Sequence, residues 1–502
     1  MSAFMMAVAV LLPIVGGIMI RFLPFKTEKT RNIFTEILVI ITSVITFALV
    51  IFRPAEGITI FHFTGALSIG FALDGVGSVF AVILAFLWPF CTLYAFEYME
   101  HEERRTSFFA FYTVTYGVTL GIAFSEGILT MYFFYELLTM VTIPLVVHTM
   151  TQEAIRATRT YMYYSIGGAA FAFIGMVFLL SNSLTSSFTA GGMLDPAVIA
   201  EDGNIFLFIY VICFCGFSVK AAMVPFSSWL PKAGVAPTPV TALLHAVAVV
   251  KAGAFACIRV TYFCFGVDFL AGTWAQDLLM TLTIITIVYG CSRALKETHF
   301  KRRLAWSTVS NLSYILFGVL MMSPLGLAGA LSHMVCHALM KICSFLCAGA
   351  VICKTEKQYI HELDGMGRKM PLTFVAFAIS GMALMGVPGL CGFVSKWNLA
   401  KAAVINPNNL TEFGIAAILI SALLTAIYMM SIVVRAFFPG RFFNHNKMEF
   451  EPGFGPESPD GTCDPSYRML IPIYAAVVVM FLIGLHPAFL NELIDAVVGS
   501  VF

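Results

Sequence analysis

Charged residues are scarce in this sequence. Asp, Glu, Lys and Arg make up 11% of its 502 residues, whereas 59% are apolar and 48 are Phe. A soluble globular domain carries about 25% charged residues. The composition therefore excludes that class and predicts an all-α polytopic membrane protein embedded in a lipid bilayer. The net charge is +1 and no basic cluster is large, so we expect no nucleic-acid partner.

Cysteine pairs of the metal-binding kind are also missing. The 12 Cys lie mostly inside apolar segments, and no C-x-x-C pair occurs. Because zinc and iron–sulfur sites commonly use that spacing, we expect small buried hydrophobic side chains, no metal and no cofactor on this chain. Residues 1–24 lack a basic n-region and a small-residue cleavage site, which predicts a retained first span.

Long apolar runs are abundant. A membrane helix needs about 20 apolar residues, and fourteen stretches qualify, near residues 2–22, 34–52, 75–98, 108–125, 128–149, 159–181, 204–224, 237–262, 274–294, 304–322, 325–353, 371–405, 411–437 and 470–497. Residues 59–75 are rich in β-branched residues and punctuated by turn residues, so they predict a small hairpin or a strand cap at one membrane face. The acidic insert from Gly440 to Tyr467 predicts a loop on the inner face.

Basic residues are distributed unevenly between alternate loops. We set aside those within or near the ends of spans, namely Lys220, Lys251, Lys341, Lys396 and Arg259. All the others except Arg53 and Lys401 then fall in or beside loops on one side. Lys and Arg accumulate in cytoplasmic loops. The distribution therefore predicts fourteen spans in the cell membrane, with both termini on the outer side.

The positions of Pro-containing breaks along the chain suggest an internal repeat. Residues 108–262 and 274–437 each hold five predicted helices, and the fourth of each set carries a Lys close to a Pro-containing break. Since five is odd, two successive units must have opposite orientations, an arrangement known from ion transporters. We therefore predict a three-helix segment at 1–107, two inverted five-helix repeats with broken helices at 108–262 and 274–437, and an inner loop with a final helix at 438–502.

Glu136 and Lys220 are the first candidate site residues. Glu136 is the sole charge in its predicted span, and Lys220 precedes a break that contains Pro225, Pro231, Pro237 and Pro239. Ionisable groups at such depth are costly and mark ion paths. One interpretation is a structural carboxyl group bonded to a neighbouring helix. The other pairs Glu136 with Lys220, so that the two groups exchange a proton when one of them moves.

The next predicted helix carries His245 and Lys251. Their six-residue separation places them roughly 9 Å apart along an ideal helix and about 120° around it. On a regular helix the two side chains would therefore not lie on one narrow face, although either could face a water-filled space between helices. For His245 a packing role and a direct role stay open. Lys251 is the stronger candidate because a buried ammonium group has fewer structural explanations.

His333, His337 and Lys341 recur at i, i+4 and i+8. This spacing stacks all three on one helix face over about 12 Å. Three titratable groups in one row predict a proton wire with water between its members, and a structural polar seam is the alternative. Lys396 follows a Gly- and Pro-containing break at 386–389, where freed backbone groups need a cavity or a protein partner. Its alternative is snorkelling to the interface beside Trp397.

Three segments carry a family resemblance. Residues 219–253, 332–352 and 386–399 (VKAAMVPFSSWLPKAGVAPTPVTALLHAVAVVKAG, SHMVCHALMKICSFLCAGAVI and GVPGLCGFVSKWNL) resemble the antiporter-like membrane subunits of respiratory complex I, multisubunit Na⁺/H⁺ antiporters and energy-converting membrane hydrogenases. The resemblance implies fourteen helices with two inverted repeats, partner membrane subunits that include related antiporter-like ones, and a peripheral redox arm. Through it, Glu136 and Lys220 match a coupled pair, and Lys251 or His245, His337 with Lys341, and Lys396 match the family's ion path.

We therefore expect a subunit that translocates protons, or protons coupled to Na⁺, within a membrane-bound redox-driven complex of the NADH dehydrogenase or hydrogenase kind. The subunit itself would hold no cofactor and perform no redox step. A stand-alone antiporter, a structural scaffold for a peripheral oxidoreductase and a quinone-reducing enzyme are the alternatives. The sequence contains no cofactor motif that would favour the last of these.

Overall fold

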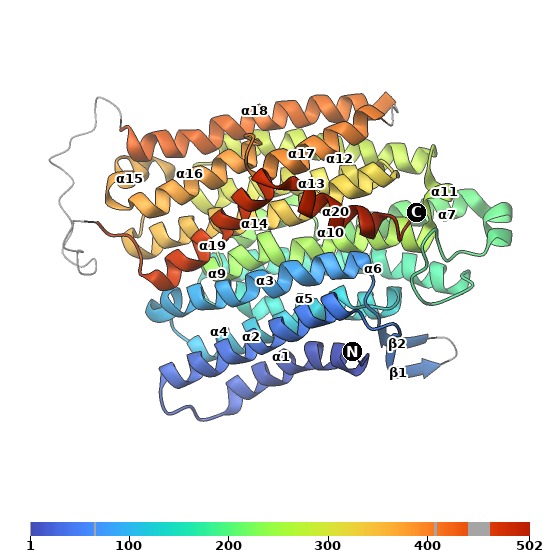
Figure 1. Ribbon diagram of the computed structural model, residues 1–502, viewed down its shortest axis with the longest axis horizontal. Coiled ribbons are helices and arrows are strands. Elements are labelled where there is room, and N and C mark those ends of the chain that lie inside the picture. The colour runs from blue at the N-terminus through green and yellow to red at the C-terminus, as the bar shows by residue number, and fades with distance from the viewer. Residues whose placement is uncertain (1, 65–66, 406–408, 440–461) are drawn as a thin grey trace.

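Long helices that run roughly side by side make up most of this computed structural model (Figure 1). The structure describes residues 2–64, 67–405, 409–439 and 462–502. Within them, twelve helices are long and apolar enough to cross a membrane. The predicted all-α polytopic membrane fold is therefore confirmed. The predicted loop at 440–467 lies mostly outside the described residues.

The first three long helices precede the predicted repeats. They are α1 (Phe4–Phe22), α2 (Glu28–Phe52) and α3 (Gly75–Tyr98), which a short turn η1 (Met99–His101) follows. Side-chain caps fix where helices begin: Thr27 accepts a hydrogen bond from the Thr30 amide, and Asp74 accepts one from Gly77 at 2.8 Å. Between α2 and α3, strands β1 (Ile58–Thr64) and β2 (Leu67–Phe71) pair antiparallel, which confirms the predicted hairpin.

The segment predicted as the first repeat contains α4 (Arg105–Ala123), α5 (Ile128–Val146), α6 (Gln152–Ser181), α7 (Pro196–Ser218), η2 (Phe226–Ser228), α8 (Trp229–Ala233), α9 (Thr238–Ala242), η3 (Leu243–Val247), α10 (Val249–Arg259) and η4 (Val260–Phe265). A short helix α11 (Val267–Leu270) follows. The η3 and η4 segments are π-helical, so the predicted helix at 237–262 is a chain of short pieces. It is nevertheless buried along its whole length.

The second segment contains α12 (Trp274–Lys296), α13 (Phe300–Leu320), α14 (Pro324–Thr355), η5 (Ile360–Leu363), α15 (Met366–Lys369), α16 (Pro371–Met385), α17 (Cys391–Ile405) and α18 (Asn409–Phe437). The predicted span at 371–405 is thus two helices of 15 residues each, and the break lies where Gly386 and Pro388 predicted it. The long helix α14 packs against α3, α13, α16, α17, α19 and α20, which places it in the middle of the bundle.

The prediction of one helix at 470–497 was wrong. The structure has α19 (Tyr467–Leu485) and α20 (Pro487–Val498), and His486 between them has non-helical dihedrals. The physical reason is Pro487, which lacks an amide hydrogen and disfavours the helical conformation of the residue before it. The count of fourteen spans stays a prediction, because α13 is too polar and α16 and α17 are too short to count among the twelve.

Candidate functional site

The interrupted end of α7 positions Lys220. The helix ends at Ser218, and the indole nitrogen of Trp229 donates to the Val219 carbonyl at 2.8 Å, which ties the next segment back over the break. Ala222 adopts a left-handed φ of 55°, so the chain cannot continue as a helix. These features leave Lys220 at the break, where its side chain is 1% exposed.

Lys220 contacts α5 through Tyr135. Its ammonium group donates a hydrogen bond to the Tyr135 carbonyl oxygen and lies 3.4 Å from the centre of the Tyr135 ring. Glu136 is the next residue and is half-buried, and its buried Oε1 atom has no hydrogen-bond partner among the described residues. The structure thus brings the predicted pair to adjacent positions. It shows no ion pair within 4.0 Å between the two side chains in the described part of the chain.

A glycine lets α10 approach this break closely. A Cβ atom at Gly253 would lie 2.5 Å from the Ala221 amide nitrogen and 2.9 Å from the Lys220 carbonyl carbon. Real Cβ atoms do not approach backbone so closely, so position 253 admits only glycine without movement. The contact sets Lys251, two residues earlier, on a helix that packs against the Lys220 segment.

His245 lies in the π-helical turn η3, and Ala248 after it has φ −95° and ψ −80°. The regular helix on which the predicted separation of His245 and Lys251 depends is therefore absent between them. The His245 ring is fully buried and stacks on Phe345 of α14 with centroids 4.9 Å apart. Neither ring nitrogen has a hydrogen-bond partner in the described residues.

Lys251 joins the two halves of the site. Its ammonium nitrogen makes a hydrogen bond with Nδ1 of His337 on α14, and both side chains are fully buried. The His337 ring in turn stacks on His333, with centroids 5.9 Å apart and planes inclined by 27°. The shared face predicted for His333 and His337 is confirmed. The contact with Lys251 was not predicted.

From His333 the contacts lead to the second break. His333 Nδ1 shares a hydrogen bond of 3.0 Å with the Ser395 hydroxyl, and the ring lies 5.1 Å from that of Tyr314. Lys396, next to Ser395, places its ammonium 5.3 Å from the centre of the same Tyr314 ring. Contacts between neighbours therefore run from Lys251 through His337 and His333 to the surroundings of Lys396.

The Lys396 side chain turns inward. It is 8% exposed and donates to the carbonyl oxygens of Leu384 at 2.6 Å and Met385 at 3.3 Å, the last two residues of α16. Lys396 thus satisfies the backbone groups that the break leaves free. The snorkelling alternative does not describe this side chain, although neighbouring Trp397 is 60% exposed.

Lys341 lies on the same face of α14 but bonds in another direction. Its ammonium donates to the Ser307 hydroxyl at 2.7 Å and to the Leu304 carbonyl at 3.1 Å, both on α13. The Tyr428 hydroxyl of α18 also donates to Ser307, at 2.7 Å. Lys341 is therefore held by neutral hydroxyl and carbonyl groups. No hydrogen bond links it to His337 in the residues that the structure describes.

A family profile described as NADH:quinone oxidoreductase/Mrp antiporter, TM, matches residues 125–425, which contain every candidate residue named above. This match covers more than half of the chain. The chain belongs to this family. A second profile, described as NADH-Ubiquinone oxidoreductase (complex I), chain 5 N-terminus, matches residues 62–109. The resemblance stated from the three sequence segments is thereby confirmed.

Relatives within the NADH:quinone oxidoreductase/Mrp antiporter family include both quinone oxidoreductase subunits and antiporter subunits. The chain is 29% identical over 384 residues to NADH-quinone oxidoreductase subunit N of Desulforudis audaxviator (strain MP104C), covering 73% of this chain and 72% of the relative. It is 26% identical over 495 residues to a probable K⁺/H⁺ antiporter protein of Rhizobium meliloti (strain 1021), covering 96% of this chain. The chain spans only 47% of that longer relative.

Solved structures share the fold. A chain of the Mrp complex from Dietzia sp. DQ12-45-1b matches with a TM-score of 0.83 at 20% identity, covering 99% of this chain and 96% of that chain. A chain of the membrane-bound sulfane sulfur reductase, an archaeal respiratory membrane complex, gives 0.82 at 20% identity, covering 100% and 98%. A chain of respiratory complex I from Thermus thermophilus gives 0.79 at 21% identity, covering 99% and 100%.

Sequence reasoning missed one partly buried ion pair in this family member. Arg259, which had been placed near a span end, is 1% exposed and pairs with Asp74, with Nη2 and Oδ1 2.7 Å apart. Phe188, Phe255 and Phe263 surround the guanidinium at 4.6–4.9 Å. Burial opposes ionisation of Asp74, which lies just before α3, and is the largest single influence on its pKa. The Arg259 charge, the hydrogen bonds from Arg259 and the hydrogen bond from the Gly77 amide together outweigh it and hold the pKa below the usual value.

Sequence reasoning also did not identify the hydroxyl side chains of the site. Ser307 bonds to Lys341 and Ser395 to His333, and Tyr428 reaches Lys341 only through Ser307. A Ser or Tyr in an apolar helix gives no sequence signal that sets it apart. Arg259 did give a signal, since an arginine inside an apolar run requires a partner. Asp74 was visible too, as an acid directly before a helix.

Proposed function

We propose that this chain is an ion-translocating subunit of a membrane-bound, redox-driven complex, with the proton as the transported ion and Na⁺ coupling as an alternative. The observation that carries the proposal is the buried hydrogen bond between Lys251 and His337. It connects a titratable group of the first predicted repeat to the row of titratable groups in the second. Buried ionisable residues in membrane helices are costly and mark ion paths.

In the proposed route, protons enter from the cytoplasmic side toward Lys251 and Lys220, pass laterally to Lys341 and leave by Lys396. The contacts of His337 and His333 support lateral transfer, because they continue from Lys251 toward Lys396. Lys341 lies on the same helix but bonds to α13, so its place in the route rests on the shared helix face and not on these contacts. His245 faces α14 from η3 with both ring nitrogens free of described partners, which suits a group that bonds to water. Glu136, beside the carbonyl that holds Lys220, biases the proton affinity of Lys220.

The proposal includes a topology and partners. Fourteen spans with both termini on the outer side account for the loop charges, and two inverted five-helix repeats account for the matching breaks. The matched structures are chains of multisubunit membrane complexes. By that likeness, this protein joins related antiporter-like subunits and a peripheral redox arm, and carries no cofactor itself. An Mrp-type antiporter component is the second candidate, because antiporter proteins occur among the relatives at similar identity.

The test uses the parent complex, purified in mild detergent with its partners identified and then reconstituted into liposomes. Lys220→Ala and Glu136→Ala should each abolish ion pumping while electron transfer in the partner subunits continues. Normal pumping in both variants would overturn the proposal. If the partner set contains no redox subunit and the complex exchanges Na⁺ or K⁺ for protons without an electron donor, the antiporter function replaces the redox-driven one.

A further inference from the structure

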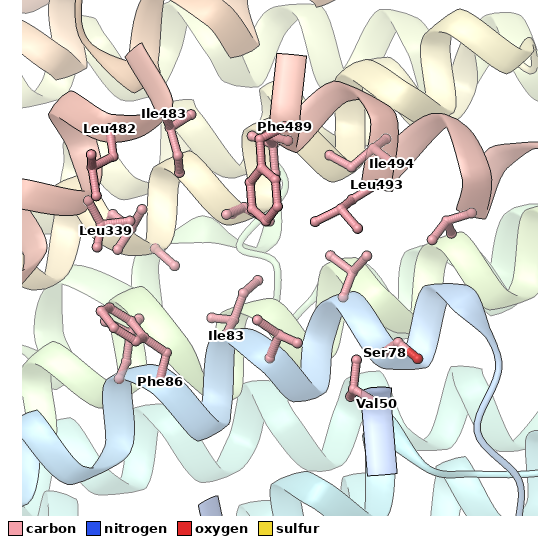
Figure 2. A pocket seen from close by; sticks show the side chains of 18 of the residues that line it. Val50, Ser78, Ile83, Phe86, Leu339, Leu482, Ile483, Phe489, Leu493 and Ile494 are labelled. Atoms are coloured by element: carbon pink, nitrogen blue, oxygen red, sulfur yellow. The ribbon is translucent and has the colours of Figure 1, made fainter. Parts of the chain in front are cut away.

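An apolar groove lies on the opposite side of α14 from the His333–His337 row. Its walls come from α2, α3, α14, α19 and α20, and its volume is about 570 Å³. Figure 2 shows Ile83 and Phe86 of α3 facing Leu482 and Ile483 of α19 and Phe489 of α20 across it. On α14 the wall is formed by Val335, Ala338 and Leu339, and helical spacing turns these side chains away from His337.

The break between α19 and α20 opens this groove. Pro487 begins α20, so the chain bends at His486. Before the bend, α19 rests on the second interrupted segment, where a Cβ atom at Gly484 would lie 2.2 Å from the Gly389 carbonyl oxygen. After it, α20 meets the start of α3, where a Cβ atom at Gly75 would lie 3.0 Å from Val497. Because both ends are fixed, space remains between α20 and the middle of α3.

Among the described residues that line the groove, three are polar or charged: Arg53, Ser78 and His486. The Ser78 hydroxyl already donates to the Asp74 carbonyl at 2.7 Å, so it is occupied. Arg53 is exposed at the end of α2, and its guanidinium has no hydrogen bond or ion pair with any described residue. In the predicted topology most basic loop residues lie on the cytoplasmic side, and Arg53 and Lys401 are the two exceptions. The groove therefore combines an apolar channel with a cation, Arg53, that has no partner in the part of the chain that the structure describes.

Size decides what kind of occupant fits. A membrane helix about 10 Å across and 30 Å long occupies on the order of 2,000 Å³, several times the groove volume. A volume of about 570 Å³ lies within the range of small-ligand sites, roughly 300–1,000 Å³. The lining from Ser78 to Phe86 follows α3 for about 12 Å, at 1.5 Å per residue. A flexible hydrocarbon chain matches this narrow, apolar space.

We propose that the groove binds an anionic phospholipid, with its phosphate on Arg53 and an acyl chain between α3 and α20. An arginine fork binds phosphate through two parallel hydrogen bonds. A lipid seated there packs against the back of the helix that carries His333, His337 and Lys341. Such a lipid site does not depend on the proposed ion path.

The test compares lipids retained by the full chain within its native complex. The complex is exchanged into nanodiscs that contain equal amounts of phosphatidylglycerol and phosphatidylcholine, and tightly bound lipids are counted by native mass spectrometry. Arg53→Gln should lower the ratio of retained phosphatidylglycerol to phosphatidylcholine about fivefold, the effect expected of one cation near an anionic head group. Lys401→Gln, which removes the other exceptional cation outside the groove, should leave the ratio unchanged.

A second pair of variants tests the acyl chain. Leu493 lines the groove and is 52% exposed, whereas Leu419 on α18 is 66% exposed and outside it. Leu493→Trp should reduce retention of both lipids, and Leu419→Trp should not. The proposal is overturned if Arg53→Gln and Lys401→Gln give equal ratios, if Leu493→Trp retains as much lipid as Leu419→Trp, or if cross-linking from Leu493 finds a helix of a partner protein in place of lipid.

Discussion

Lys220 and Lys396 occupy similar places in the two halves of the chain. Each lies at the break of an interrupted helix and is at least nine-tenths buried. Each ammonium donates to backbone carbonyl oxygens and lies over a tyrosine ring, Tyr135 of α5 for Lys220 and Tyr314 of α13 for Lys396. Since α5 and α13 are the second helices of the two predicted repeats, the likeness supports an internal repeat.

The two lysines differ in the residues next to the carbonyl groups that accept their hydrogen bonds. Tyr135 is followed by Glu136, whereas residues 380–390 around Leu384 and Met385 contain no acidic residue. Lys220 therefore has a carboxyl group in reach that can change its proton affinity, and Lys396 is held by neutral dipoles. On the proposed route, these two lysines serve different steps: Lys220 is the regulated group and Lys396 is the outlet.

Replacing each lysine by arginine should have the largest effect. Arginine keeps the positive charge but does not release its proton in proteins. Lys220→Arg and Lys396→Arg should each lower proton pumping by the reconstituted complex about a hundredfold, the size expected when a proton-transfer group is lost. Electron-transfer rate serves as the control. If either arginine variant pumps at the wild-type rate, that lysine has only a structural role.

A glycine packs closely against the backbone at each break. Replacing it by alanine should test how much this close packing contributes to stability. A Cβ atom at Gly392 would lie 1.8 Å from the Ala383 carbonyl oxygen, closer than the 2.5 Å approach at Gly253. Both Gly392→Ala and Gly253→Ala should lower the stability of the complex in thermal unfolding, by about 1–3 kcal/mol, and Gly392→Ala more. Gly167→Ala on α6, where a Cβ atom meets nothing within 4 Å, is the matched control. Equal melting temperatures for all three would contradict the tight packing described.

A smaller effect is expected at the hydroxyl group that orients His333. Ser395→Ala removes the 3.0 Å hydrogen bond to His333 Nδ1 and retains the helix. A hydrogen bond of this kind contributes about 1 kcal/mol, so pumping should fall about fivefold without loss of assembled complex. Unchanged pumping would show that the orientation of His333 does not matter for the second half of the path.

The smallest effect is expected for His245→Phe. The substitution preserves ring stacking on Phe345 and removes two ring nitrogens that have no described partner. If His245 contributes through bound water, pumping should decrease about twofold to fivefold, because one water-mediated contact is worth about as much as one direct hydrogen bond. A wild-type rate would favour the packing role that the sequence left open.

Much of this architecture could be predicted because it depends on local sequence. Apolar runs indicate spans, Gly386 and Pro388 mark the second break, and the i, i+4, i+8 spacing puts His333, His337 and Lys341 on one face of α14. The break at His486 was predictable too, since Pro487 lies inside the apolar run at 470–497. These features need no knowledge of which helices touch.

The rest depends on tertiary packing. Lys251 and His337 are 86 residues apart, and Asp74 and Arg259 are 185 apart. Their contacts arise from how α10 packs against α14 and α3, which periodicity does not encode. The π-helical turn at His245 was equally hidden, because the surrounding residues suit an ordinary helix and the irregular backbone is set by its buried neighbours.

The most direct test of the central claim measures the carboxyl group of Glu136 itself. Its infrared C=O stretch, assigned by its loss in Glu136→Gln, should change in Lys220→Ala, because the neighbouring ammonium is removed. In Lys396→Ala the band should stay where it is in the unmodified complex. Identical carboxyl bands in the two lysine variants would contradict the account, since Glu136 would then not be coupled to Lys220.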